Sequence, residues 1–299
     1  MIKLLRAGVH RYLKSPLFAI CVLLSLGLGT WFGIHLYNEP YFSEGHMWLV
    51  IFELAVIAVF VSLTVGTEYA HGGLRRKIVS GASRERIFFS ELLVTVAAVT
   101  LFYLLYGATV ALINTRLIAN FTPELLFLLV VGMWLCNISF AVAVLAVAIL
   151  VPSRVISAVL ALLMLLGMLV WNDSIGARLD QPAEWESFHY DEELDTFVPE
   201  RQENPNYIRP PLRTVLTAVN NALPTSQLLI HSTALHPYFY SEEAIEQAQI
   251  EGAPFNKDRF QAISAEELHT MRTLPLYSLG EILLLVLAGV LIFRRRSLR

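Results

Sequence analysis

The chain has little charge for its length. Only 16% of its 299 residues are Asp, Glu, Lys or Arg, 56% are hydrophobic, and the mean hydropathy is +0.57. A soluble domain of average composition carries about 25% charged residues. Because so few charged side chains cannot cover a globule with polar surface, we expect lipid to be the main solvent. The net charge of −3 gives no indication of a nucleic-acid partner.

Cysteine is also scarce. The only two, Cys21 and Cys136, lie in separate apolar runs. Buried free cysteines behave as small hydrophobic residues, so we interpret both as packing residues rather than as a disulfide or a metal-binding pair.

Several enzyme signatures are missing. The chain contains no HExxH and no G-x-S-x-G sequence, which argues against a metalloprotease or a serine hydrolase embedded in the membrane. It has no GxxxxGK[ST] sequence and therefore no P-loop of its own. His231, His236 and His269 fall in an expected external segment, and the five-residue spacing of the first two does not place them on one helical face. We expect no metal, no cofactor and no catalytic residue in this chain.

Long apolar runs dominate what is present. A membrane-spanning helix needs roughly 20 mostly apolar residues. Six segments meet or approach this length: Leu17–Tyr37, Met47–Gly66, Ser90–Ile113, Glu124–Val151, Val155–Trp171 and Leu276–Phe293. We expect the first to be retained rather than cleaved as a signal peptide. The predicted fold class is an all-α polytopic membrane protein with six transmembrane helices.

The distribution of cations predicts the orientation. Of the 22 Lys and Arg residues, 14 precede the first span, follow the sixth, or lie between spans two and three or four and five. The short loops on the opposite side, 38–46 and 114–123, contain only Arg116. By the positive-inside rule we expect both termini of this multi-pass membrane protein to be cytoplasmic. The long segment 172–275 is then external.

The spans divide the chain into five parts. Residues 1–15 place Ile2, Leu5, Val9 and Leu13 on one helical face, which predicts an amphipathic helix at the membrane surface. Residues 16–171 contain spans one to five, residues 172–275 form the external part, residues 276–293 the sixth span, and residues 294–299 a cytoplasmic tail. The external part holds 17 of the 25 acidic residues and has a local charge of −10.

The external part is predicted to be mostly helical. Its first portion, Asp173–Pro211, is acidic and weakly periodic, and we expect little regular structure there. Leu212, Val215, Leu216, Val219 and Leu223 then form an apolar helical stripe that ends at Pro224. Further helices are expected over Thr225–Leu235, after the capping residue Ser241, and from Ser264 to Pro275.

The cytoplasmic loop between spans two and three reads GTEYAHGGLRRKIVSGASRERIF from Gly66 to Phe88. Gly72 and Gly73 allow a tight reversal, and Leu74–Ser80 is compatible with a short helix. Gly81 follows where a helix needs its left-handed residue, and Ser83 can cap the next helix. Binding to the membrane surface alone would explain the cations but not the glycine stops. The pattern indicates a stiff docking element for a cytoplasmic partner.

Two polar residues within the spans are candidates for a substrate pathway, Glu53 and Asn137. An ionisable or polar group inside a membrane is a functional candidate because it is costly to place there. A hydrogen-bonded carboxyl near the outer interface for Glu53, and a contact between helices for Asn137, remain open as structural alternatives.

The loop motif resembles that of the membrane subunits of ABC type-2 exporters. An E-Y pair, a glycine, L-R-x-K and then G-x-S-R follow the second of six spans. The matching residues are Glu68, Tyr69, Gly73, Leu74, Arg75, Lys77, Gly81, Ser83 and Arg84, with Ile78 on the same helix. The amphipathic N-terminus and the LPTSQ sequence, Leu223–Gln227, are also similar to that family.

The resemblance implies a permease subunit of an ATP-driven exporter in a bacterial cell membrane. The loop helix would be the coupling helix that contacts a separate ATP-binding cassette subunit, which binds ATP and Mg²⁺. A second permease subunit, identical or related, would complete the transporter. The substrate would be a peptide, including an antimicrobial peptide, a drug or a lipid-like molecule.

Two alternatives belong to other classes. A sensor or immunity protein would bind an extracellular cationic peptide without transporting it, for which the acidic external segment is suited. An intramembrane enzyme is the third alternative and has no supporting motif in the sequence.

Overall fold

The computed structural model describes residues 1–38, 43–70, 72–115, 122–151, 153–191, 196–235 and 265–295. The chain is mostly helical, and six of its helices are long and apolar enough to cross a membrane. These six helices correspond to the six predicted spans. They are α2 (Pro16–Asn38), α3 (Ser43–Ala70), α5 (Arg84–Ile113), α7 (Pro123–Leu150), α8 (Arg154–Trp171) and α13 (Ala265–Arg295).

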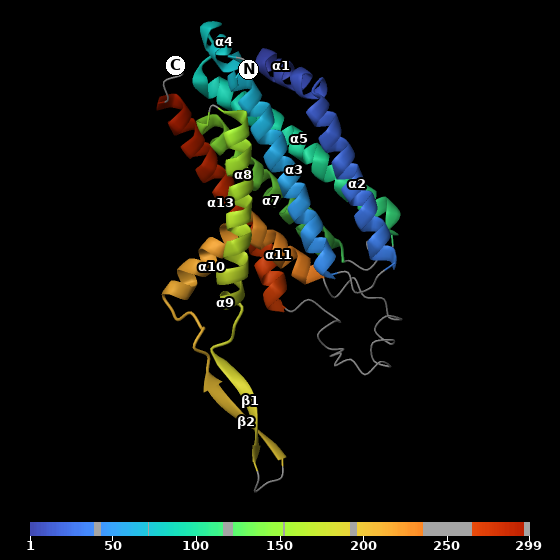
Figure 1. The fold of residues 1–299 in the computed structure, drawn as a ribbon, viewed down its shortest axis with the longest axis vertical. Helices are drawn as coiled ribbons and strands as arrows, with labels where there is room; N and C mark the ends of the chain where they lie inside the picture. The colour runs from blue at the N-terminus through green and yellow to red at the C-terminus, as the bar shows by residue number, and fades with distance from the viewer. Residues whose placement is uncertain are drawn as a thin grey trace.

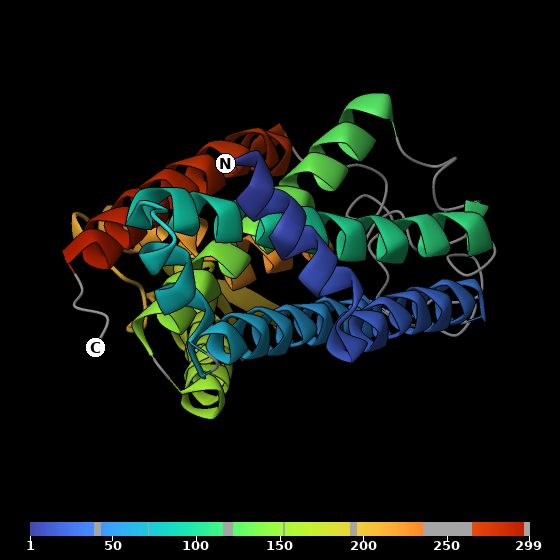
Figure 2. The ribbon, with the colours of Figure 1, turned by 90° about the horizontal axis from the view of Figure 1, so that it is seen from above.

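The shorter elements gather at the two ends of the bundle. At one end lie α1 (Ile2–Leu13), α4 (Gly73–Val79) and the last turns of α13 (Figure 1). At the other end lie a π-helix, η1 (Asn172–Gly176), the short α9 (Ala177–Leu179), strands β1 (Glu184–Asp191) and β2 (Thr196–Glu203), α10 (Leu212–Ala222) and α11 (Pro224–Leu235). Figure 2 shows α1 lying across the first end rather than along the spans.

The bundle is organised around α7, which is as deeply buried as α3 and more so than the other four spans. α7 packs against α3, α5 and α13, while α2 packs mainly on α5 and α8 mainly on α3. A cluster of aromatic rings joins the N-terminal helices to this core. Phe60 of α3 meets Tyr12 of α1 edge-on at 5.2 Å and Phe102 of α5 at 5.0 Å, and Phe18 of α2 lies against both phenylalanines. Edge-to-face pairs of this kind add to the energy of burying the rings.

The expectation of little regular structure between Asp173 and Pro211 is wrong. Besides η1 and α9, this region forms an antiparallel hairpin in which β1 pairs with β2, with Glu184 opposite Glu203 and Asp191 opposite Thr196. Aromatic and β-branched residues favour strands, and both arms of the hairpin contain them, so the local preference for strand outweighs the high charge.

The expected end of a helix at Pro275 is also wrong, because α13 continues through this proline to Arg295. A proline costs a helix one backbone hydrogen bond, and neighbouring helices can compensate for that loss within a membrane protein. Met271, whose carbonyl would accept the missing bond, and Leu274 are completely buried, and Met271 packs with Leu125 of α7. The predicted helices beginning at Ser241 and Ser264 have their start residues outside the described part of the chain.

The expected external part does not lie entirely outside the bundle. α11 contacts α3, α7, α8 and α13, so it inserts between the ends of the spans. His231, which the sequence pattern placed in an external helix, is buried, and its ring lies against Gly132 of α7. The two helices predicted on either side of Pro224 are both present, as α10 and α11.

Close packing of α3 against α8 depends on Gly66. A Cβ atom at Gly66 would lie 2.5 Å from the Cα of Arg154. We predict that Gly66→Ala destabilises the protein by about 1–3 kcal/mol, because a backbone atom cannot move away as a side chain can. Gly27→Ala on α2 is the control, since a Cβ there meets nothing within 4 Å. Thermal unfolding in detergent, followed by circular dichroism, should show a lower midpoint for Gly66→Ala only; equal midpoints would contradict this packing.

Candidate functional site

The helix α4 is bounded by left-handed glycines at both ends. Gly72 has φ +65° and precedes the helix, and Gly81 has φ +88° and follows it. The Gly81 amide donates to the Ile78 carbonyl at 2.9 Å, and the Ala82 amide donates to the Lys77 carbonyl at 3.1 Å. This is a Schellman ending, and it requires a left-handed residue at Gly81. The predicted helix stop at Gly81 is confirmed, and the helix begins and ends one residue before the predicted Leu74–Ser80.

The next helix begins three residues later. The Ser83 side chain accepts a hydrogen bond from the Arg86 amide, and Glu85 lies in the first turn of α5. Both features stabilise a helix N-terminus. Only Ala82 lies between Gly81, which ends α4, and Ser83, which caps α5. The connection from α4 to α5 is therefore stiff, as predicted.

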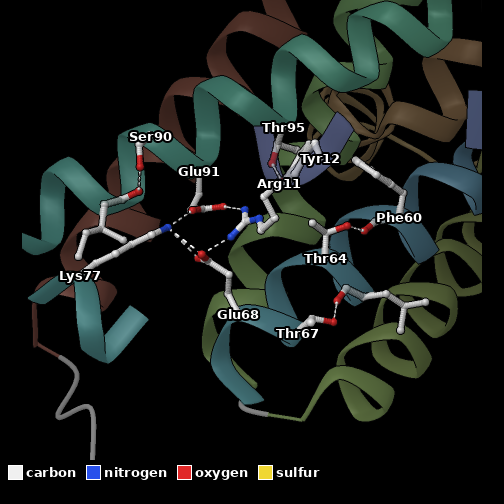
Figure 3. A network of polar contacts seen from close by, with 12 residues as sticks. Arg11, Tyr12, Phe60, Thr64, Thr67, Glu68, Lys77, Ser90, Glu91 and Thr95 are labelled. Atoms are coloured by element: carbon white, nitrogen blue, oxygen red, sulfur yellow. Dashed lines mark hydrogen bonds and ion pairs between the residues drawn. The ribbon is translucent and has the colours of Figure 1, made fainter. Parts of the chain in front are cut away.

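Four charged side chains, each from a different helix and each buried or half-buried, contact one another on the side of α4 that faces the spans (Figure 3). They are Arg11 of α1, Glu68 of α3, Lys77 of α4 and Glu91 of α5. The Lys77 ammonium lies 2.8 Å from Glu68 and 2.7 Å from Glu91. The Arg11 guanidinium contacts Glu68 and lies 2.8 Å from Glu91. Each cation contacts both carboxylates, and the two positive charges balance the two negative ones.

Burial makes this cluster structurally important. The Glu91 side chain is 4% exposed, Glu68 11% and Lys77 16%. Removing one partner of a buried ion pair leaves an uncompensated charge, which costs several kcal/mol. Burial alone would lower the pKa of Arg11, but the Glu91 and Glu68 carboxylates outweigh it and hold the pKa above its ordinary value. Arg11 therefore stays charged and fastens α1 to α3 and α5.

The opposite face of α4 is exposed. Val79 is 81% exposed, and Gly72, Arg75, Arg76, Val79 and Ser80 line a shallow open depression. Ile78, which the sequence pattern assigned to partner contact, is half-buried and packs against the core of its own chain. Among the described side chains of α4, Val79 is thus the apolar one that faces outward. The side chains of Tyr69 and Leu74 lie outside the described residues.

The remaining predicted loop residues have structural roles. A Cβ atom at Gly73 would meet the Glu68 carbonyl oxygen at 3.2 Å, so the α4 backbone lies close to the end of α3. Arg84 donates to the Arg294 carbonyl at 2.9 Å and connects α5 to the end of α13. The structure therefore brings Glu68 and Lys77 together, and places Gly73, Gly81, Ser83 and Arg84 where they shape or support the loop.

Arg11 and Glu91 are not among the site residues that the sequence pattern predicts, although both belong to the ion cluster. One signal was available: Glu68 and Glu91 lie at the ends of adjacent spans on the cation-rich side, where buried carboxylates need cationic partners. Which of the cations would supply them could not be read from the pattern.

The two pathway candidates lie inside the bundle but have incomplete hydrogen bonding. Asn137 donates to the Met133 carbonyl of its own helix at 2.8 Å, so this bond does not join two helices. Within the described part of the chain, the Asn137 Oδ1 and the Glu53 Oε1 have no hydrogen-bond partner. Both residues are buried, on α7 and α3. Their role in a pathway stays a prediction.

A second polar cluster lies around the LPTSQ sequence. The Gln227 carbonyl oxygen accepts hydrogen bonds from Cys136 of α7 at 2.9 Å and Ser278 of α13 at 2.5 Å. Its amide nitrogen donates to the Asn221 carbonyl at 2.7 Å. Gln227 thus joins α7 and α13 to the connection between α10 and α11. Cys136 and Cys21 are buried free thiols, in agreement with their interpretation as packing residues.

No protein-family model matches this chain, and no curated protein is similar enough to match.

The ion cluster leads to a stability prediction. Glu91→Gln should leave two buried cations sharing one carboxylate and destabilise the protein by roughly 3–5 kcal/mol. Glu85→Gln is the control, since that carboxylate is half exposed and its Arg294 partner is 3.9 Å away, an arrangement worth less than about 1 kcal/mol. Thermal unfolding in detergent measures the difference. Hydrogen exchange should also increase in α1 for Glu91→Gln alone; unchanged exchange there would mean that the cluster does not hold α1.

Proposed function

We propose that this chain is the membrane-embedded permease subunit of an ABC type-2 exporter and that α4 is its coupling helix. A separate ATP-binding cassette subunit would dock on α4 and bind ATP and Mg²⁺. The observation that carries the proposal is the two-sided character of α4: its inner side is bound by buried ion pairs, and its outer side is exposed at Arg75, Arg76 and Val79. Because the ion pairs fix the orientation of α4, this exposed face stays available to a partner.

The geometry supports a mechanical role for Lys77. Its ammonium is bonded to Glu68 at the end of α3 and to Glu91 near the start of α5. A force applied to the outer face of α4 would therefore reach both spans through one side chain. Arg11, bonded to the same two carboxylates, would carry the displacement on to α1 at the membrane surface. Because the glycine ending and the serine cap stiffen the loop, movement of a docked ATPase would not be lost in bending.

Pairing with a second permease subunit, identical or related, would complete the transporter. The substrate class consistent with the proposal is a peptide, a drug or a lipid-like molecule that leaves the cell. The chain itself would contribute no catalytic residue.

A sensor or immunity protein is the second candidate. It is favoured by the β1–β2 hairpin, which projects away from the bundle at the end opposite α4 (Figure 1). The acidic character of segment 172–275, with a local charge of −10, would attract a cationic peptide in either case. A sensor does not require an ATPase on α4, so ATPase co-purification separates the two candidates.

The proposed orientation places α4 in the cytoplasm and the hairpin outside. Cysteines introduced at Ser80 and Gln202, both exposed in the fold, should react with a membrane-impermeant maleimide from opposite sides. In intact cells we expect labelling of Gln202→Cys only, and labelling of Ser80→Cys after the membrane is opened. The parent chain, whose two cysteines are buried, gives the background. Labelling of both positions in intact cells would refute this topology.

The docking surface leads to a prediction with a matched control. Arg75 and Arg86 are both exposed cations of the same loop, but only Arg75 lines the depression on α4. Arg75→Glu should remove the ATPase from the purified complex by charge repulsion, whereas Arg86→Glu should retain it. Val79→Asp should also remove it, because an unpaired carboxylate would be buried at the contact, while the isosteric Val79→Thr should retain most of it. Retention by both Arg75→Glu and Val79→Asp would exclude docking on α4.

A further inference from the structure

Helix α10 carries an apolar stripe that the described part of the chain leaves uncovered. Leu212, Val215 and Val219 are spaced at three and four residues and therefore share one helical face. They are 57%, 58% and 41% exposed. Leu216 and Leu223 extend the same face and are half-buried. Three exposed aliphatic side chains in a row indicate a surface that is normally covered.

Hydrogen bonds to the rest of the chain determine which way the stripe points. Arg213 donates to the Leu179 carbonyl at 2.5 Å, and its guanidinium lies over the Tyr207 ring at 4.6 Å. Near the other end of the helix, Asn220 accepts a hydrogen bond from Ser226 at 3.0 Å. Because Arg213 and Asn220 lie on one side of α10, they prevent the helix from rotating about its axis, and the stripe stays turned away from them.

The position of α10 along the bundle corresponds to a membrane interface. α8 begins beside Gly66, two residues before Glu68 of the ion cluster, and ends at Trp171. Its 18 residues span roughly 27 Å at 1.5 Å per residue, close to the ~30 Å thickness of a hydrocarbon core. α10 contacts η1 and α9, the two elements that directly follow Trp171. A tryptophan at this position is typical of the boundary between acyl chains and headgroups.

The neighbouring surface is apolar as well. α10 also packs against α13, whose exposed side chains at this end of the bundle include Leu276 and Leu279. At the opposite end α1 has a related arrangement: Ile2, Val9 and Leu13 are exposed, whereas Tyr12 is buried and Arg11 is bonded inward. The two ends of the bundle thus each carry one short amphipathic helix with its apolar side facing outward.

We infer that α10 is an interfacial lipid-binding helix that inserts Leu212, Val215 and Val219 into the acyl-chain region of the leaflet opposite α1. The occupant is phospholipid rather than a second copy of the chain. A stable protein interface buries about 1,200–2,000 Å² in total, far more than a stripe of three aliphatic side chains can supply. A lipid surface sets no such minimum, and its affinity grows with each apolar side chain inserted.

This anchorage would have a structural consequence for α11. Only Leu223 separates α10 from α11, and Gln227 fastens the start of α11 to α7 and α13. α10 and α11 form a helical hairpin whose first helix is anchored by lipid and whose second is anchored by hydrogen bonds to the spans. Both anchors keep α11 inserted in the bundle.

The test measures the depth of α10 in a bilayer. Val215→Cys places a bimane label on the stripe, and Thr217→Cys is the matched control, exposed on the opposite face of the same helix. The full chain, with both native cysteines replaced, is reconstituted in phosphatidylcholine–phosphatidylglycerol vesicles. Quenching is measured with a lipid that carries a nitroxide near its glycerol backbone and, separately, with aqueous iodide. The label at Val215 should be quenched several-fold more by the lipid nitroxide than by iodide, and the label at Thr217 should show the reverse.

Two results would overturn the inference. Efficient iodide quenching at Val215 would mean that the stripe faces water. Protection of Val215 from both quenchers would mean that protein covers it, as a second copy would. Because some cysteine variants fold poorly, Leu212→Cys with Thr214→Cys provides a second pair of positions on the same two faces, and it must give the same pattern of quenching for the inference to hold.

Discussion

The mutual neutralisation of Arg11, Glu68, Lys77 and Glu91 is the interaction on which the arrangement of this end of the bundle depends. Two cations and two carboxylates are withdrawn from water at the junction of α1, α3, α4 and α5. Each is tolerable there only because the others are present. The cluster sets the position of α4 against the spans, turns Val79 outward, and holds the amphipathic α1 across the end of the bundle.

At the opposite end, α11 is fixed by neutral hydrogen bonds: Gln227 accepts from α7 and α13 and donates to the end of α10. The charged contacts at this end, such as that of Arg272 on α13 with Glu124 on α7, are exposed to solvent. Neutral hydrogen bonds contribute less individually than charge-assisted ones. The buried ion cluster behind the proposed docking face is thus fastened more strongly than the Gln227 cluster, which agrees with a force entering the bundle at α4 under the proposed exporter function.

The sequence allowed the spans and the loop to be predicted because their signals are local. Twenty apolar residues, a glycine where a helix must end, and a serine before a helix start each act within a few residues, and Gly81 and Ser83 have the predicted roles. The ion cluster could not be predicted, since its partners are separated by up to 80 positions. The inward packing of Ile78, the hairpin after α9 and the continuation of α13 through Pro275 likewise depend on tertiary contacts or on competition between local preferences.

Photo-crosslinking in living cells from a benzophenone amino acid at Val79 tests the central claim most directly, because this side chain lies on the outer face of α4 and is 81% exposed. The account predicts a single dominant protein adduct, identified by mass spectrometry as an ATP-binding subunit, that disappears when the same probe replaces Ile78. Adducts confined to lipid or to this chain, or the same adduct from both positions, would contradict the proposal that α4 is the surface on which an ATPase docks.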